Sequence, residues 1–231
     1  MRSFQKQLLA LMWFNLLFFT ACETDKRPLN QGIIQYEIKY LDSEKENPLI
    51  TLLPETMSLS FKDNNTIIKI EGYLGLFSFA YITNAKKDKN STLLKIIDKK
   101  YLYQISNGYP SYGYDELMLD YTVKHCTEVK DILGYRCKKA TFEFKNPKIS
   151  PIDVFYTNEI AIEKPNRNNP FKELDGVLLE FQVRLNNINM RFKAIKIWEA
   201  EISDDLFEVP DGFEKISKEM MQDKMKNYNA S

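Results

Sequence analysis

Apolar and polar residues alternate along most of this chain, and that alternation limits what it can fold into. In GIIQYEIKY, residues 32–40, the side chains of Ile34, Tyr36, Ile38 and Tyr40 fall on one face and polar side chains on the other. A period of two residues is typical of a half-buried β-strand. The same period predicts further strands in residues 56–62, 66–71, 76–83, 92–97, 100–106, 121–130, 135–145, 152–158, 177–185 and 190–199.

The composition agrees with a sheet and excludes some classes of partner. Aromatic residues make up 13% of the chain, with 15 Phe and 13 Tyr against 8 Gly, which favours strands over helices. Lys plus Arg and Asp plus Glu are both 32, and no basic block stands out, so nucleic acid is not an expected partner. No repeat or linker divides residues 32–231, which we expect to form a single domain.

Two segments break the strand pattern. Residues 115–119 predict a short helix, and the apolar residues of segment 209–228, spaced three to five apart, predict a C-terminal amphipathic helix. In the last strand Met190 and Phe192 share a face, whereas Ile195 has the opposite parity, which indicates either a bulge or a strand buried on both faces. The sequence thus predicts a mainly β fold, a single curved antiparallel sheet with a short helix and a C-terminal helix.

The first residues have the pattern of a secretory signal peptide. Arg2 and Lys6 precede residues 8–20, which are apolar except for Asn15, and the small residue Ala21 follows. A run of about 13 residues is shorter than the roughly 20 that span a bilayer. We expect residues 1–21 to be removed; a buried N-terminal helix or an uncleaved anchor is the alternative.

Residues 19–22, Phe-Thr-Ala-Cys, resemble the lipobox of bacterial lipoproteins. The resemblance implies that Cys22 receives a diacylglycerol on its thiol and an acyl chain on its amine after cleavage. Several acyl chains anchor a protein stably, whereas one anchors it marginally. The expectation is a protein held at the outer membrane through Cys22, with residues 22–31 as a flexible stalk. Glu23 and Asp25 hint at export to the cell surface, so the periplasmic and outer faces both stay open.

Two cysteines remain, Cys126 and Cys137, in two alternating runs around the turn KDILG. A hairpin that places these two residues opposite each other also faces Val123 with Ala140 and puts both thiols on the polar side. In an oxidising compartment this register predicts a disulfide; two reduced thiols on a solvated face are the alternative.

No catalytic or metal-binding pattern is evident, and no cofactor is expected. His125, the single histidine, lies in a strand, where packing or an edge position is favoured over a general base. Ser58, Ser60 and Ser78 lie inside strands without a nucleophile elbow, and the acid pairs at 115–116 and 204–205 suit capping or solvation. The loop NGYPSYGYD, residues 107–115, offers either a flat aromatic contact for a sugar or peptide or rings packed over an open edge of the sheet.

The second half of the chain resembles small exported proteins of the Bacteroidota. The stretches DILGYRCKKATFEF, VFYTNEI and LDGVLLEF, and DDLFEVPDGFEKIS near the end, are similar to patterns of the GLPGLI-type and related families. The resemblance implies an open half-barrel like that of lipoprotein carriers, with an apolar concave side closed by helices.

These observations predict a membrane-anchored, non-enzymatic lipoprotein. Large alternating aromatics and the resemblance to carriers favour a hydrophobic or lipid ligand on the concave side. The alternative is an envelope scaffold or interaction lipoprotein with a filled core, docking on an outer-membrane complex. A third hypothesis, an envelope hydrolase, is supported by no set of catalytic residues in the sequence.

Overall fold

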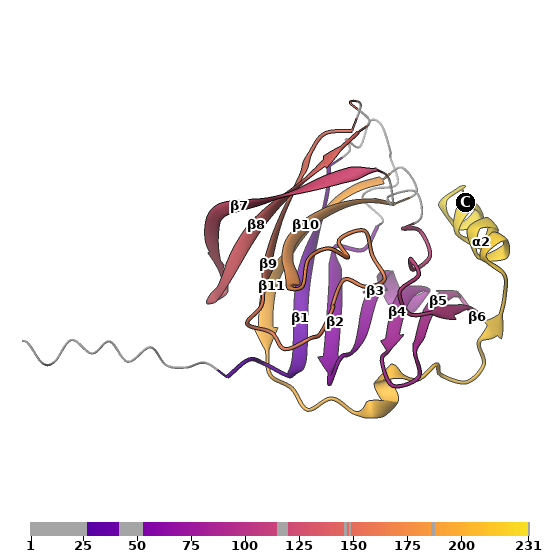
Figure 1. Cartoon of the computed structure of the whole chain (residues 1–231). Helices are drawn as coiled ribbons and strands as arrows, with labels where there is room; N and C mark the ends of the chain where they lie inside the picture. The colour runs from indigo at the N-terminus through magenta and orange to yellow at the C-terminus, as the bar shows by residue number, and fades with distance from the viewer. Residues whose placement is uncertain are drawn as a thin grey trace, which may run out of the picture.

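The computed structural model describes residues 27–41, 53–114, 120–145, 147, 149–185 and 188–230. These residues form one mainly β domain with α-helix α2 near its C-terminal end, and the predicted fold class is confirmed (Figure 1). The strands are β1 (Gln31–Tyr40), β2 (Thr56–Lys62), β3 (Asn65–Glu71), β4 (Phe77–Asn84), β5 (Lys89–Ile96), β6 (Lys99–Ser106), β7 (Tyr121–Ile132), β8 (Tyr135–Phe144), β9 (Ile152–Thr157), β10 (Val177–Leu185), β11 (Ile188–Trp198) and β12 (Glu214–Lys215). The helices are α2 (Lys218–Ala230) and the 3₁₀ turns η3 (Tyr73–Gly75) and η5 (Asp204–Phe207).

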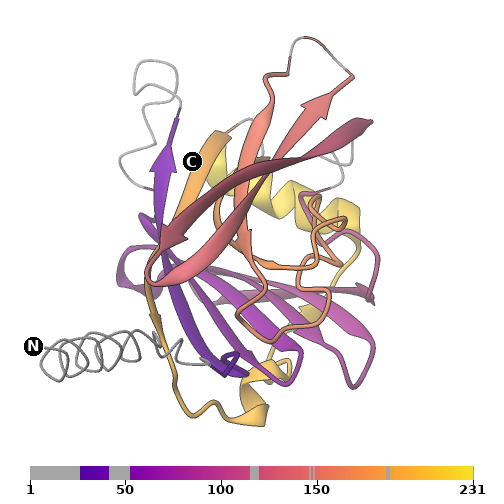
Figure 2. The same ribbon diagram turned by 60° about the vertical axis from the view of Figure 1, so that its left-hand side comes forward.

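All twelve strands belong to one open sheet, in the order β12-β6-β5-β4-β3-β2-β1-β11-β10-β9-β8-β7. Every neighbouring pair is antiparallel except β12 with β6. Strands β1–β6 form a meander, and β7–β11 curl over one side of it, as Figures 1 and 2 both show. We call the enclosed side concave and the other side convex. The first strand pairs with the eleventh, so the β1–β11 ladder joins the two halves of the chain.

Alternation places the predicted core residues on the concave side. Ile34, Tyr36 and Ile38 of β1 are buried there, together with Phe79 and Tyr81 of β4. The hairpin between β2 and β3 turns at Asp63 and Asn64, both with positive φ. Burial continues on the convex side of β4, where Ala80 and Ile82 pack in a second, smaller core.

The chain after β11 explains why β4 is buried on both sides. Residues 199–217, which we call the C-terminal strap, cross the convex side and pack Ile202 and Phe207 onto it. The strap then pairs with the edge strand β6 through β12, and α2 follows on the concave side, where Met221 is fully buried (Figure 1). The predicted C-terminal helix is therefore present but begins at Lys218.

In β11 the apolar side chains change from one face of the strand to the other at Ile195, and the structure shows why. Pairing with β1 shifts between Gln35 and Tyr36, whose partners are Lys196 and Ala194, so that Ile195 is left in a bulge. Ile195 is exposed, whereas Phe192 and Ala194 remain in the core. Of the two readings that the sequence left open, the bulge is confirmed.

Candidate functional site

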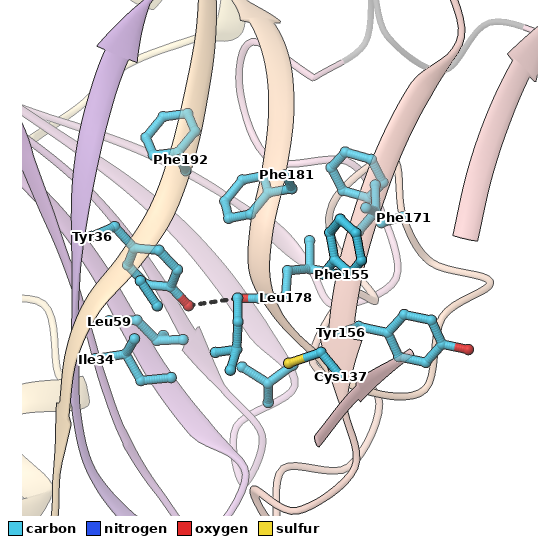
Figure 3. Close-up of a cluster of buried hydrophobic side chains, with 14 of the residues drawn as sticks. Ile34, Tyr36, Leu59, Cys137, Phe155, Tyr156, Phe171, Leu178, Phe181 and Phe192 are labelled. Carbon is cyan, nitrogen blue, oxygen red and sulfur yellow. Dashed lines mark hydrogen bonds between the residues drawn. The ribbon is translucent and has the colours of Figure 1, made fainter. Parts of the chain in front are cut away.

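The concave side is where the sequence predicts a hydrophobic ligand, and aromatic rings fill much of it (Figure 3). Phe181 stacks on Phe192 with ring centroids 5.0 Å apart. Phe171 meets Phe181 edge-on at 6.0 Å and Phe142 at 5.1 Å. The rings come from β8, β10, β11 and the chain between β9 and β10, so they pack the β7–β11 half of the sheet together.

One polar group stands among these rings. The hydroxyl of Tyr36 donates a hydrogen bond of 2.8 Å to the carbonyl oxygen of Leu178, across the concave side from β1 to β10 (Figure 3). Burial raises the pKa of Tyr36 above its ordinary value, because the phenolate would be charged in an apolar surrounding. Tyr36 therefore acts as a neutral donor that fixes the two strands relative to each other.

Residues 158–176, which we call the inserted loop, fold into the concave side instead of passing over it. The loop contributes apolar side chains to the core, including Phe171. Asn166 donates hydrogen bonds to two backbone carbonyl oxygens of the loop, those of Leu174 at 2.7 Å and Gly176 at 2.9 Å. Asn168 ties the loop to β4 by donating to Oγ1 of Thr83 at 3.0 Å. The alternating pattern does not predict this loop, although the run NRNNP at 166–170 is a signal of side chains that cap local turns.

The concave side contains small apolar cavities. One, of about 70 Å³, lies between the inserted loop and β1–β4, and another, of about 100 Å³, lies between the sheet and Met225 of α2. Pockets that bind small molecules usually measure about 300–1,000 Å³. Within the described part of the chain, the concave side is therefore occupied mainly by protein side chains.

Of the three tyrosines in the tyrosine-rich loop, two are packed and one is exposed. Tyr112 and Tyr114 pack against the concave side, where the Tyr114 ring stacks on Tyr81 at 5.5 Å. Burial raises the pKa of Tyr114 to about 12. Tyr109 is 65% exposed. Two of the three rings are therefore packed as predicted, but they lie on the concave side against β4 and not over an edge of the sheet.

The predicted register of the cysteine hairpin is wrong. Near the start of β7, Val123 faces Phe142 and not Ala140, and a bulge then leaves residues 126–128 without regular partners. Cys137 lies opposite Lys130, and both cysteines are free thiols. The physical reason is the bulge, which alternation in β7 did not reveal.

The two thiols also lie in different surroundings, contrary to the expectation that both lie on the polar side. Cys126 is partly exposed, with its Sγ 3.7 Å from Oγ1 of Thr141. Cys137 is fully buried among the concave core residues, as Figure 3 shows. Burial raises the pKa of the Cys137 thiol to about 12, with a smaller contribution from the charge of Asp131.

Some predicted features lie outside the described residues. These are the signal peptide at 1–21, the lipidation site Cys22 and the short helix at 115–119. The stalk expected over 22–31 ends earlier than predicted, because Leu29 forms a β-bridge with Ile160 and its carbonyl oxygen accepts from the amide of Ala161 at 2.8 Å.

Among the described residues, His125 and Asp204 contact structural partners. His125 is exposed on the edge strand β7, with Nδ1 3.4 Å from the hydroxyl of Tyr156. Asp204 pairs with Lys62 at 2.9 Å, and this hydrogen bond holds the pKa of the carboxyl below its usual range. In the described ranges no three His, Cys, Asp or Glu side chains gather as a metal site, and no helix there is long and apolar enough to cross a bilayer.

A third cavity, on the convex side, was not predicted. It measures about 420 Å³ and lies between strands β3–β6 and the C-terminal strap. We call it the convex cavity; its lining consists of Ile67, Lys69, Glu71, Gly75, Ser78, Ala80, Ile82, Leu93, Lys95, Lys100, Asp205, Leu206, Glu208, Pro210 and Phe213. Alternation in β3–β6 already puts the three lysines on this side, but nothing in the sequence shows that the strap covers them.

Comparisons with known proteins show the fold alone. No family model matches the chain, and no curated protein does. Two solved structures of PNGF-II, in space groups P21 and C2, are similar to it, with TM-scores of 0.53 and 0.52 at 14% and 15% sequence identity. The matches cover 84% and 86% of this chain but only 32% and 33% of PNGF-II, so the chain spans about a third of that protein's length. What the chain shares with PNGF-II is therefore its curved open sheet.

Proposed function

We propose that the chain is a non-enzymatic, lipid-anchored interaction protein of the outer membrane, related to the exported lipoproteins of the Bacteroidota. Its anchor is Cys22, and its sheet domain docks onto another envelope protein. The observation that carries this proposal is the filled concave side: the rings and the inserted loop leave cavities of about 70 and 100 Å³ there. A docking protein with a filled core is favoured over a carrier that encloses a lipid.

The free edge of the sheet supports docking. Among the described residues, β7 pairs on one side only, with β8. Its backbone groups on the other side are available to an added strand. The bulge after His125 and the charge of Lys124 limit indiscriminate pairing with other edges, as in natural edge strands. Val129, on the same strand, is 46% exposed and offers an apolar contact.

The similarity to PNGF-II supports the same proposal. There a sheet of this kind makes up about a third of a longer chain. A sheet domain that is one part of a longer chain in one protein is suited to packing against a separate partner chain in another.

Anchoring is tested by detergent phase partition of the protein expressed in a Gram-negative host. The wild-type chain is expected in the detergent phase and Cys22→Ser in the aqueous phase or retained with its leader. Cys126→Ser serves as the matched control and keeps the wild-type behaviour. A Cys22→Ser chain that has lost residues 1–21 and still partitions with the wild type would contradict a lipid anchor. Protease treatment of intact cells then separates a surface location, in which the domain is cleaved, from a periplasmic one.

The choice between docking and carriage is tested by native mass spectrometry after incubation of delipidated protein with envelope lipid extract. We expect no lipid in the concave side, so any lipid that the wild type retains should be retained equally by Met225→Asp. In the rival hypothesis, a lipid carrier, the lipid would bind in the apolar cavity of about 100 Å³ beside α2. Stoichiometric lipid that is lost in Met225→Asp would favour that rival and contradict the filled-core proposal.

Docking at the β7 edge is tested by photo-crosslinking in intact envelopes. A crosslinking amino acid at Val129 is expected to give a discrete adduct. The matched position is Ile97, which is 63% exposed in the turn between β5 and β6, away from β7 in the sheet order. Adducts of equal yield at both positions, or none at Val129, would argue against the edge as the docking surface.

A further inference from the structure

The convex cavity is the largest of the cavities described above. Its volume of about 420 Å³ falls within the range of small-molecule pockets. Its floor is the convex face of β3–β5, where Ile67, Ala80 and Ile82 are buried, and the strap supplies a wall with Leu206 and Phe213. An apolar body of drug-like size is therefore accommodated there without any change in the concave core.

Two lysines at the rim of this cavity stand in an unfavourable arrangement. Lys95 of β5 and Lys100 of β6 are directly opposite each other in the antiparallel register, and both line the cavity. Like charges directly opposite on neighbouring strands destabilise a sheet. An anion placed between the two ammonium groups would reverse the sign of this interaction.

The protein itself supplies little compensation for these two charges. Nζ of Lys95 donates to the carbonyl oxygen of Gly75 at 3.0 Å, and Nζ of Lys100 lies 5.8 Å from the centroid of the Phe213 ring. Among the described residues, neither lysine makes an ion pair with a carboxylate. Both therefore keep a hydrogen-bonding ammonium group available at the cavity.

Two of the three acidic residues of the lining already form ion pairs. Glu71 pairs with Lys69 at 2.7 Å, and Glu208 pairs with Lys87 at 2.5 Å. Asp205, in the strap, is the one lining carboxylate for which the described residues include no ion pair. Against the two unpaired lysines this leaves one positive charge in excess at the rim.

We infer that the convex cavity binds an anionic amphiphile, with the apolar body on the floor of β3–β5 and the anionic head between Lys95 and Lys100. A charged head with an apolar tail matches a cavity whose floor is aliphatic and whose rim carries paired lysines. The ligand class includes free aromatic or aliphatic carboxylates and the anionic lipids of a membrane. This site is separate from the β7 edge, so its test is independent of the test of the docking proposal.

The test uses matched ligands of opposite charge on the purified full chain. In saturation-transfer NMR titrations, 4-phenylbutyrate is expected to bind, and 4-phenylbutylamine, which carries the same body with a cationic head, is not. Monomeric dihexanoyl phosphatidylglycerol and dihexanoyl phosphatidylcholine form the second matched pair. Binding of the phosphatidylglycerol identifies a lipid head group as a source of the anion, and binding of phenylbutyrate alone identifies a free carboxylate.

The lysines are tested by Lys95→Gln with Lys100→Gln, for which the anion affinity is expected to fall at least tenfold. Lys99→Gln is the control, because Lys99 is exposed at the same hairpin and does not line the cavity. Lys100→Glu should replace the repulsion by an opposite-charge pair, raising the melting temperature by about 1–3 °C while abolishing anion binding. Equal binding of the amine and the acid, or anion binding unchanged in the double variant, would overturn the inference.

Discussion

At the scale of single residues, the turn between β7 and β8 has a leucine in a backbone conformation that is unfavourable for it. Leu133 has a φ of 57° and Gly134 a φ of 79°, which are the left-handed conformations of a two-residue hairpin turn. Glycine adopts this conformation at no steric cost, whereas a branched aliphatic side chain does not. Leu133 is 47% exposed, so burial of its side chain contributes little stability to offset the strained backbone.

Leu133→Asn is therefore expected to stabilise the protein. Asparagine tolerates the left-handed region, and Asn-Gly is a favoured pair for this turn. We expect the free energy of unfolding in urea to rise by about 0.5–1 kcal/mol. Leu206→Asn, at an exposed position without positive φ, is the control; an equal gain there would show that polarity alone is responsible.

Cys137 predicts a dependence of stability on alkaline pH. Burial raises its pKa from about 9 to about 12, so over this interval the folded state holds a proton that the unfolded state releases. The free energy of unfolding should fall as the pH rises from 9 towards 12. The fall between pH 9 and 11 should be about 2 kcal/mol larger in wild type than in Cys137→Ala.

Urea unfolding at both pH values measures this difference. Cys126→Ala removes the partly exposed thiol and should leave the wild-type slope unchanged. A Cys137→Ala variant that loses as much stability as wild type would assign the alkaline loss to other groups, such as the buried tyrosines.

The cysteines also show which buried side chains could be predicted from the sequence and which could not. Alternation gave the correct buried side for Ile34, Tyr36 and Phe79 because each lies in a regular strand. It failed for Cys137 because the bulge in β7 breaks the register, and a bulge without an obvious glycine or proline leaves no local mark in the sequence.

At the scale of elements, the C-terminal helix depends on a small contact. Met221 is fully buried between α2 and the concave face of β4–β6, whereas Met220 is 45% exposed. Alternation and helical spacing predicted one amphipathic helix that included Phe213 and Ile216. Those two residues instead belong to the strap, since the pairing of β12 with β6 depends on a distant strand that local periodicity does not reveal.

Met221→Ser is expected to release α2 while the sheet stays folded. The substitution removes the one side chain of α2 that is fully buried in the described residues, and short isolated helices are marginal in water. Hydrogen exchange should lose protection throughout α2 with little change in β1–β5. Met220→Ser should keep wild-type protection, and global unfolding in Met221→Ser would contradict a local role.

At the scale of the whole molecule, the β1–β11 ladder is the join between the two halves of the sheet. The alternating pattern identified which residues face inward but not which strands are neighbours, because neighbours far apart in sequence leave no local signal. Gly32 lies at this join, where an added Cβ would approach the carbonyl oxygen of Trp198 to 2.5 Å. That space is closed by backbone, which cannot move without disturbing the ladder.

Gly32→Ala is therefore expected to weaken the entire domain. The clash with backbone should lower the free energy of unfolding by about 1–3 kcal/mol, in one cooperative transition. Glu37→Ala, at an exposed position of the same strand, should be within about 0.5 kcal/mol of wild type. A loss confined to β10 and β11 in hydrogen exchange would show that the halves unfold separately.

The same join has a consequence for the order in which the molecule is made. The first strand leaves the ribosome long before its partner β11, and the strap that covers β3–β6 comes later still. Loop closure over such a separation must precede any gain from the contact, so a partly synthesised chain has an incomplete sheet and uncovered apolar faces. A chaperone that holds nascent chains would find its binding sites on β1–β6, and would lose them only when the C-terminal strap arrives.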